Sequence, residues 1–175
     1  FPPALAGLAD LYLERSARYV DRYTAAIGEP PFSCFSVVAG PLPFGLGFPG
    51  LTYVGARVLT LPYMSTTSLA HEVLHSWWGT GVRIDASEGN WAEGLTTLLA
   101  DHDLAAEDDP EEARMMRERW LRDFASLSAA DDIAPSRFRT KEHTPSQSVG
   151  YHKVAMALLM LRDRIGADAF NEGLR

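Results

Sequence analysis

The sequence predicts an α+β fold that is predominantly helical, with one small sheet in the amino-terminal half. Apolar residues recur at helical spacing in several long stretches. Only two short runs, residues 35–39 and 56–61, have the β-branched and aromatic composition of strands. Of the 175 residues, 46% are hydrophobic, and four Trp and eight Phe can fill a sizeable core. We therefore expect residues 1–175 to form a single domain.

The elements expected before residue 80 are a long helix, a sheet and a shorter helix. Residues 4–26 have the amphipathic pattern of a helix that ends at Gly28. A Gly- and Pro-rich stretch, residues 40–50, joins the two strand-like runs, which we expect to share one sheet. Residues 67–78 are predicted to form the next helix. The core side of the first helix is expected to contain Leu8, Leu11, Tyr12, Tyr19 and Tyr23.

Three helices are expected after residue 80. Residues 79–89 are rich in Gly, Ser and Asp, as is typical of a surface loop, and residues 90–105 are predicted to form a buried helix. A solvent-backed helix over 111–127 follows, and a long loop over 131–148 separates it from a last helix around Tyr151. The apolar side of helix 111–127 is expected to contain Met116, Trp120, Phe124 and Leu127.

Charge and cysteine content exclude several classes of protein. The net charge of −7 and pI near 5.2 argue against a nucleic-acid or anionic-membrane partner, because no Lys/Arg stripe offsets the acids. No apolar run is long enough for membrane insertion, and the start lacks the layout of a secretory signal. The single Cys34 has no partner within the chain, so we expect a buried, inert thiol and no disulfide.

The most informative motif is His71-Glu72-Val73-Leu74-His75, which lies in a predicted buried helix. At about 100° per residue, both imidazoles and the carboxylate lie within one narrow arc of the helix surface. Two neutral imidazoles one turn apart can bind a single Zn²⁺, and the adjoining Glu72 can contact a water there. The alternative is a pair of core histidines, but burying them with a carboxylate is costly unless a cation pairs them.

A catalytic zinc site needs a third protein ligand and an open position for water. The best candidate is Glu93 in the segment Asn90-Trp91-Ala92-Glu93-Gly94, at the start of the predicted helix 90–105. The alternative is purely local. Asn90 as N-cap, with Glu93 three residues later, could form a capping box.

These segments resemble the active site of the gluzincin metallopeptidases of the leucyl and alanyl aminopeptidase type, relatives of leukotriene A4 hydrolase. In that family eighteen residues separate H-E-x-x-H from the Glu of an N-E-G segment. Here seventeen residues separate His75 from Glu93, and Ala92 stands where the family usually has Asn. The loop 79–89 can absorb the missing residue. The resemblance covers about residues 35–161 and implies a thermolysin-like catalytic core, one Zn²⁺ per chain and a peptide or protein substrate.

A third segment supports the resemblance. Residues 148–156 are similar to the family's Tyr-x-Lys-Gly helix, whose Tyr donates a hydrogen bond to the developing oxyanion, and this implies that role for Tyr151. Val154 replaces the family's Gly. The alternative is a core tyrosine, because Tyr151, Val154 and Ala155 belong to one apolar stripe at helical spacing.

One departure from the family concerns substrate binding. Its aminopeptidases hold the substrate's α-amine with the Glu of a G-x-M-E-N loop, and the corresponding stretch here, residues 45–53, contains no acid. A buried ammonium needs a paired carboxylate, so the usual exopeptidase anchor is absent from its expected place. Two alternatives therefore stay open beside a peptidase: an inactive metal-binding interaction domain, and a zinc hydrolase of a non-peptide substrate.

The implied mechanism is metal-assisted hydrolysis. His71, His75 and Glu93 would hold the zinc, Glu72 would act as general base, and Tyr151 would stabilise the oxyanion. Each ligating His should donate its other N–H to an acceptor, for which the sequence offers Asp101. The chain begins without Met. We expect it to be an excised catalytic segment of a longer polypeptide with further domains.

Overall fold

The fold is predominantly helical with a small sheet, as predicted. A computed structural model describes residues 1–85 and 87–175. Ala86, in the predicted loop 79–89, lies outside the described residues. The chain divides into two compact units, one formed by residues 1–81 with Arg175 and the other by residues 82–174. No helix among the described residues is long and apolar enough to cross a membrane.

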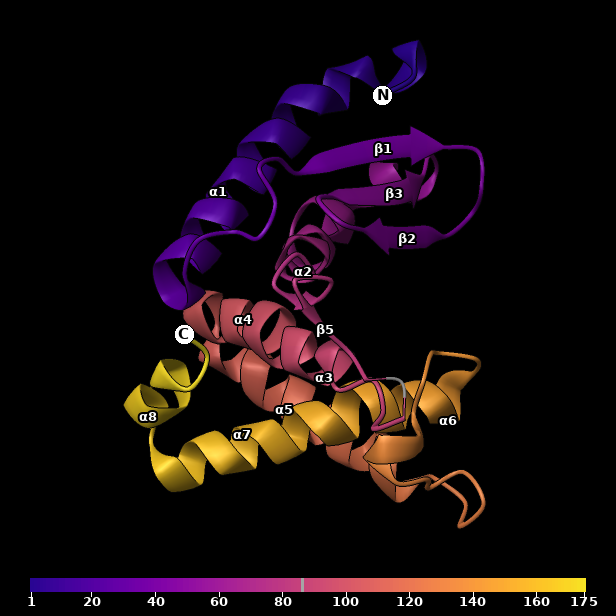
Figure 1. The fold of residues 1–175 in the computed structure, drawn as a ribbon. Helices are drawn as coiled ribbons and strands as arrows, with labels where there is room; N and C mark the ends of the chain where they lie inside the picture. The colour runs from indigo at the N-terminus through magenta and orange to yellow at the C-terminus, as the bar shows by residue number, and fades with distance from the viewer. Residues whose placement is uncertain (86) are drawn as a thin grey trace. The chain divides into compact units, whose positions relative to one another are not determined.

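The first unit combines two α-helices with a three-stranded sheet of order β1-β3-β2 (Figure 1). β1 pairs with β3 in parallel, and β2 pairs with β3 in antiparallel fashion. The helices α1 and α2 contact each other, and Tyr12 Oη donates a hydrogen bond to the Leu59 carbonyl oxygen at 2.9 Å. The elements are η1 (Pro3–Leu8), α1 (Ala9–Ile27), β1 (Ser36–Gly40), β2 (Gly45–Phe48), β3 (Leu51–Gly55), η2 (Val58–Thr60), η3 (Pro62–Ser65), α2 (Thr67–Leu74) and β4 (Trp78–Gly79).

Three predictions about the sheet and the first helix were wrong. Residues 56–61 contain a turn and the short 3₁₀ helix η2, and the strand expected there lies earlier, at β3. The predicted connection 40–50 itself contains β2. Gly50, with a φ of 67°, makes the tight turn that connects β2 to β3. Leu11 is 38% exposed. The buried side of α1 is the stripe Tyr12, Ser16, Tyr19, Tyr23 and Ile27.

Cys34 is also placed differently from the prediction. Its side chain is exposed, because the residue lies in irregular chain just before β1 begins at Ser36. The aromatic neighbours in the sequence suggested burial. Burial of aromatic neighbours in irregular chain does not determine the burial of the residue between them.

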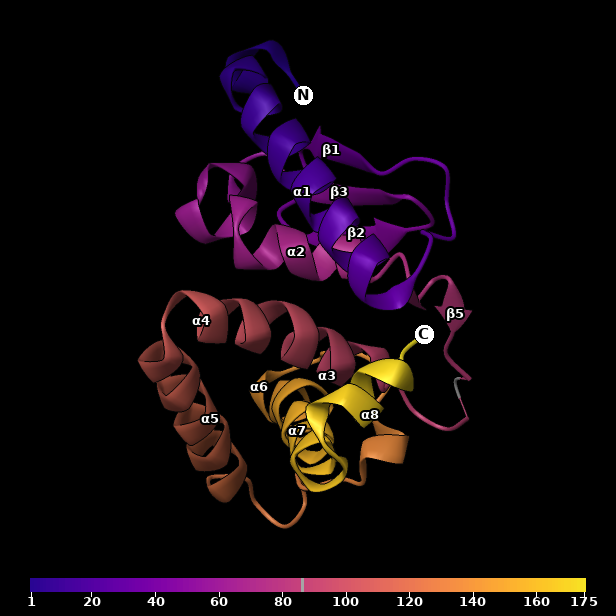
Figure 2. The same cartoon turned by 90° about the vertical axis from the view of Figure 1, so that its left-hand side faces the viewer.

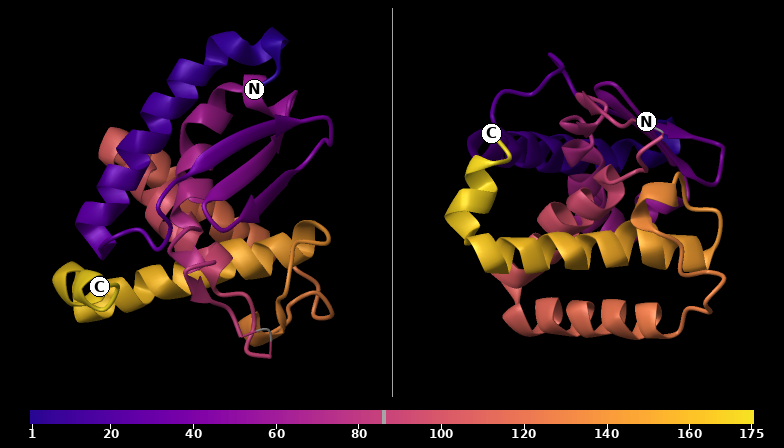
Figure 3. Two further views of the ribbon diagram at one scale, coloured as in Figure 1. Left: turned by 45° about the horizontal axis from the view of Figure 1, so that its top comes forward. Right: turned by 60° about the horizontal axis from the view of Figure 1, so that its bottom comes forward.

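The second unit is built from helices, two of which change to π-helical geometry along their length. One runs through α3 (Ala92–Thr96), η4 (Thr97–His102) and α4 (Asp103–Asp108), and the other through α6 (Thr144–Gln147), η6 (Ser148–Lys153) and α7 (Val154–Ile165). α5 contacts η6, and α3 contacts α7 (Figures 2 and 3). The remaining elements are β5 (Val82–Arg83), α5 (Pro110–Ala125), η5 (Pro135–Arg137) and α8 (Ala167–Glu172).

Most helices of the second unit were anticipated, with shifted ends. The predicted helix 90–105 begins at Ala92 and continues to Asp108, and the predicted loop 131–148 contains η5 and α6. Trp120 is buried as expected. Phe124 is 39% exposed, and the Lys153 ammonium lies 5.0 Å from the centre of its ring. Phe124 therefore takes part in a surface cation–π contact.

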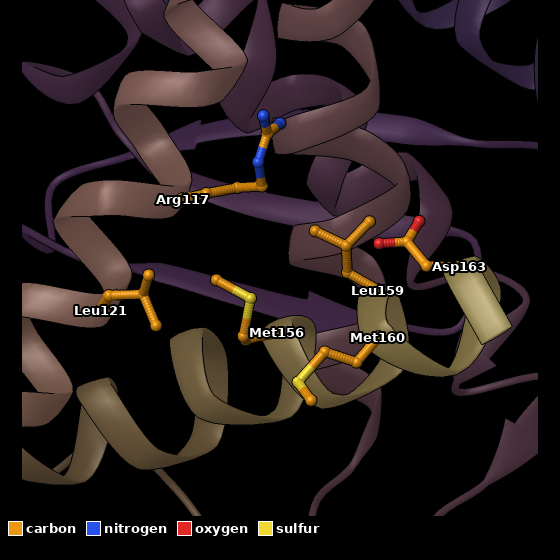
Figure 4. A pocket seen from close by; sticks show the side chains of 6 residues that line it. All are labelled: Arg117, Leu121, Met156, Leu159, Met160 and Asp163. Atoms are coloured by element: carbon orange, nitrogen blue, oxygen red, sulfur yellow. The ribbon is translucent and has the colours of Figure 1, made fainter.

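A cavity of about 450 Å³ lies beside α5 and α7 (Figure 4). Leu121 and Met160, at its wall, are 54% and 65% exposed. None of the candidate zinc ligands or catalytic residues lines it. The lining residues are Arg117, Leu121, Met156, Leu159, Met160 and Asp163.

Candidate metal centre

α2 separates core residues from candidate ligands by its two faces. Leu69, Ala70, Val73 and Leu74 are fully buried, whereas His71, Glu72 and His75 are half-buried on the other side. The helix ends at Leu74, earlier than predicted, and His75 is its C-cap. Because His75 keeps helical backbone angles, it stays one turn from His71. The centres of the two imidazole rings are 4.8 Å apart, with the rings nearly perpendicular at 77°.

A hydrogen bond fixes the tautomer of His75. Its Nδ1 lies 2.9 Å from the backbone carbonyl oxygen of Trp78. A carbonyl oxygen only accepts hydrogen bonds, so Nδ1 must carry the proton and Nε2 has the lone pair that can bind a metal. Zinc-binding histidines commonly donate to a backbone carbonyl in this way. For His75 the acceptor is therefore Trp78, and Asp101 stays a prediction for His71.

Glu72 is held by the sheet of its own unit. Thr52 Oγ1, in β3, donates a hydrogen bond to Glu72 Oε2 at 3.1 Å. Gly47, in β2, is the residue paired with Thr52 across the strands, and a Cβ added there would lie 3.9 Å from Oε2. Thr52 is not among the site residues predicted from the sequence. A lone Thr in a strand gives no signal until the pairing of the strands is known.

Glu93 lies half-buried in the first turn of α3. The capping-box alternative is wrong, because Trp91 is the N-cap and no side chain caps the helix. Asn90 instead donates from Nδ2 to the carbonyl oxygen of Arg139 at 3.2 Å. At Gly94 an added Cβ would overlap the Val154 side chain, so the position next to Glu93 requires a glycine.

Tyr151 lies half-buried within the π-helical η6. Its ring packs edge-on against Phe138, with ring centres 6.1 Å apart and an angle of 77°. On the following residue, the His152 ring stacks on Trp120 at 5.9 Å, and its Nδ1 lies 3.1 Å from Asp123 Oδ2. Contacts of Tyr151 and of the adjacent His152 therefore restrain this turn of η6.

Among the described residues, His71, His75 and Glu93 form a group that could hold a metal ion, with one potential ligand atom of each within 4.8 Å of the others. Two imidazoles and a carboxylate are a donor set of catalytic zinc sites. The chemistry of the side chains and the tautomer of His75 therefore fit zinc.

No protein-family model and no curated protein matches the chain. Solved structures do match. The chain is similar to an M1 zinc metallopeptidase from Deinococcus radiodurans, with 26% identity and a TM-score of 0.71 over 91% of this chain. A variant of a two-domain M1 zinc metallopeptidase bound to L-arginine gives 25% identity, the same coverage of this chain and a TM-score of 0.71. A Deinococcus radiodurans variant bound to a Tyr-Ser-Ala substrate gives 25% identity and a TM-score of 0.69.

The chain spans about a third of the length of these structures, 34–35% of each. These structures are named as zinc enzymes, and the His/His/Glu group of this chain could hold a metal ion. The structural neighbours are M1 zinc metallopeptidases, and together with the His/His/Glu group they support a site for one Zn²⁺.

Proposed function

We propose that this chain is the catalytic segment of a zinc-dependent peptidase with a thermolysin-like core, related to the aminopeptidases of the gluzincin group. The observation that carries the proposal is the face of α2, where His71, Glu72 and His75 lie together and the Trp78 carbonyl fixes the tautomer of His75. The likeness to M1 zinc metallopeptidases gives this motif a matching fold.

In this proposal His71, His75 and Glu93 hold one zinc ion. When bound, zinc polarises a substrate carbonyl and lowers the pKa of water to about 7. The remaining chemistry belongs to side chains of the chain. The His75 Nδ1–H bond to Trp78 orients the ring so that Nε2 is presented as a ligand.

Glu72 is the general base and later the general acid. Its carboxylate accepts a proton from the attacking water and later donates that proton to the leaving amine. Each cycle therefore restores the carboxylate form of Glu72. The Tyr151 hydroxyl donates a hydrogen bond to the oxyanion that develops on the substrate carbonyl. The π-helical geometry of η6 fits this role, because such segments are frequent at functional sites.

The proposed specificity differs from that of a usual aminopeptidase. The segment that resembles the family's amine-binding loop forms β2 and β3 here and contains no Asp or Glu. Without an acid on these strands, a free substrate amine gains no paired charge there. We therefore expect an N-acetylated peptide and its free-amine form to be cleaved at comparable rates, as liquid chromatography of the products can measure.

The decisive experiment combines Glu72→Gln with metal analysis. The wild-type protein, loaded with zinc, should cleave members of a mixed peptide library, and a chelator should stop the cleavage. Glu72→Gln should keep the wild-type zinc content and lose cleavage, because the amide cannot accept the proton. If the variant kept wild-type hydrolysis, Glu72 would not be the base. If the wild type bound zinc and cleaved no peptide, a metal-binding interaction domain or a non-peptide hydrolase would be the better assignment.

A further inference from the structure

The hydroxyl of Thr52 contacts the candidate base directly. Thr52 is fully buried in β3, the central strand of the first unit's sheet, and its Oγ1 lies 3.1 Å from Glu72 Oε2. We infer that Thr52 is a positioning residue that orients the Glu72 carboxylate for proton transfer. The inference rests on the proposed function and adds a residue to it.

The central place of β3 makes Thr52 a rigid support. β1 pairs with β3 along one edge and β2 along the other, so Thr52 has a register partner on each side, Val37 and Gly47. The donor therefore belongs to a strand fixed by two ladders, whereas Glu72 belongs to a helix. The terminal torsion of a Glu side chain is otherwise broad. The hydrogen bond from Thr52 therefore restrains the orientation of the Glu72 carboxylate relative to the strand.

Only one carboxylate oxygen is engaged by this bond. A hydrogen bond from a buried hydroxyl to a carboxylate is charge-assisted and fixes the plane of the group. With Oε2 held by Thr52, Oε1 is the oxygen directed to the reacting proton. Positioning of this kind contributes to rate because proton transfer needs the correct distance and angle between donor and acceptor.

Gly47 is the second part of the same arrangement. It is paired with Thr52 across β2 and β3, and the position of its missing Cβ is 3.9 Å from Glu72 Oε2. A longer side chain there would point at the carboxylate. Thr52 thus holds Oε2 while its strand partner leaves the space next to it open.

The first test is kinetic. Thr52→Val preserves the shape of the side chain and removes only the hydroxyl. We expect kcat for a cleaved library peptide to fall about 10- to 100-fold, with KM changed less than about 2-fold, because the bond orients the base and not the substrate. Thr52→Ser restores the hydroxyl and should recover most of the rate. Zinc content should equal that of the wild type in both variants.

A matched control and a measurement without turnover complete the test. Thr24→Val makes the same change where Oγ1 donates to the Val20 carbonyl within α1, and it should leave kcat unchanged. In the metal-free protein, Thr52→Val should lower the denaturant midpoint of unfolding more in the Glu72 background than in a Glu72→Ala background, because only the former has the bond to lose.

The outcomes separate the inference from the proposed function. If Glu72→Gln abolishes cleavage while Thr52→Val keeps the wild-type kcat, the peptidase stands and the positioning role of Thr52 falls. If the wild type cleaves no peptide, the peptidase proposal is rejected. The denaturant midpoints of Thr52→Val in the two backgrounds then test the contact between Thr52 and Glu72. Equal shifts in both backgrounds would overturn the contact itself, and unequal shifts would support the orientation of Glu72 by Thr52.

Discussion

Gly150→Ala tests whether packing around Tyr151 matters for turnover. Gly150 is fully enclosed, and a Cβ added there would overlap three carbons of the Phe138 ring. That ring is 1% exposed and packs edge-on against Tyr151. The backbone of Phe138 is also fixed, because its carbonyl accepts a hydrogen bond from Asn90 at 2.8 Å and its N–H donates to Pro135 at 3.0 Å. The ring therefore has little room to retreat.

The magnitude follows from this geometry. The Phe138 ring must shift by more than about 1 Å, from 2.2 Å to at least 3.4 Å, to reach ordinary van der Waals separation from the new methyl group. Overpacking of this kind costs about 1–3 kcal/mol of unfolding free energy. If the shift moves the Tyr151 hydroxyl by a similar distance, kcat should fall about 100-fold, because displacements of 1 Å in an active site have effects of that size. Urea unfolding and steady-state kinetics measure the two effects.

A second-site change and a control make the prediction specific. Phe138→Leu in the Gly150→Ala background should restore part of the lost stability, since the smaller side chain leaves room for the methyl group. Gly7→Ala is the control, because a Cβ at Gly7 meets no atom within 4 Å, and it should change neither quantity. Wild-type stability and kcat in Gly150→Ala would refute the argument that this packing fixes Tyr151.

Three further predictions concern the metal, the oxyanion and acid stability. His75→Ala should reduce bound zinc to a trace by elemental analysis, and unchanged stoichiometry would remove His75 from the ligands. Tyr151→Phe should keep zinc and lower kcat about 10²–10³-fold, whereas an unaffected rate would make Tyr151 a core residue. Burial raises the pKa of the Asp103 carboxyl, but hydrogen bonds from His102 and Arg162 outweigh it and lower that pKa below its usual range. The resulting stability is present above the unfolded-state pKa of about 3.9 and is lost as pH falls through the lower folded-state pKa. Asp103→Asn should therefore cost about 1–3 kcal/mol at pH 7 and much less near pH 2, as urea midpoints can report.

Helical periodicity predicted the helices well because it depends on local spacing alone. The stripe Tyr12, Tyr19 and Tyr23 is buried as expected, and the face of α2 with His71 and His75 follows from the same 3.6-residue repeat. Leu11, in contrast, is exposed although it was expected on the buried side. It lies about 100° from Tyr12, so a small error in the centre of the buried face exposes it.

The strands could not be placed in the same way. β2 contains two glycines, and all four of its residues are exposed, so the period-2 signal of a half-buried strand is missing. Pairing with β3 creates the strand, and pairing is a contact between distant residues. The same reason kept Thr52 out of the predicted site, since its relation to Glu72 spans 20 residues and depends on the register of the sheet.

The contact between α3 and α7 shows how the second unit accommodates Val154, which departs from the family pattern. Val154 stands where the resembling family has a glycine, and its side chain occupies the space in front of Gly94. The added bulk on α7 therefore faces a residue without a side chain on α3, and the two helices still contact each other. Glu93 precedes Gly94, and Tyr151 lies one helical turn before Val154. This single contact therefore links the segments of both residues. Gly94→Ala should therefore disturb the segments of Glu93 and Tyr151 together. Val154→Gly in that background should relieve the overlap with the Val154 side chain.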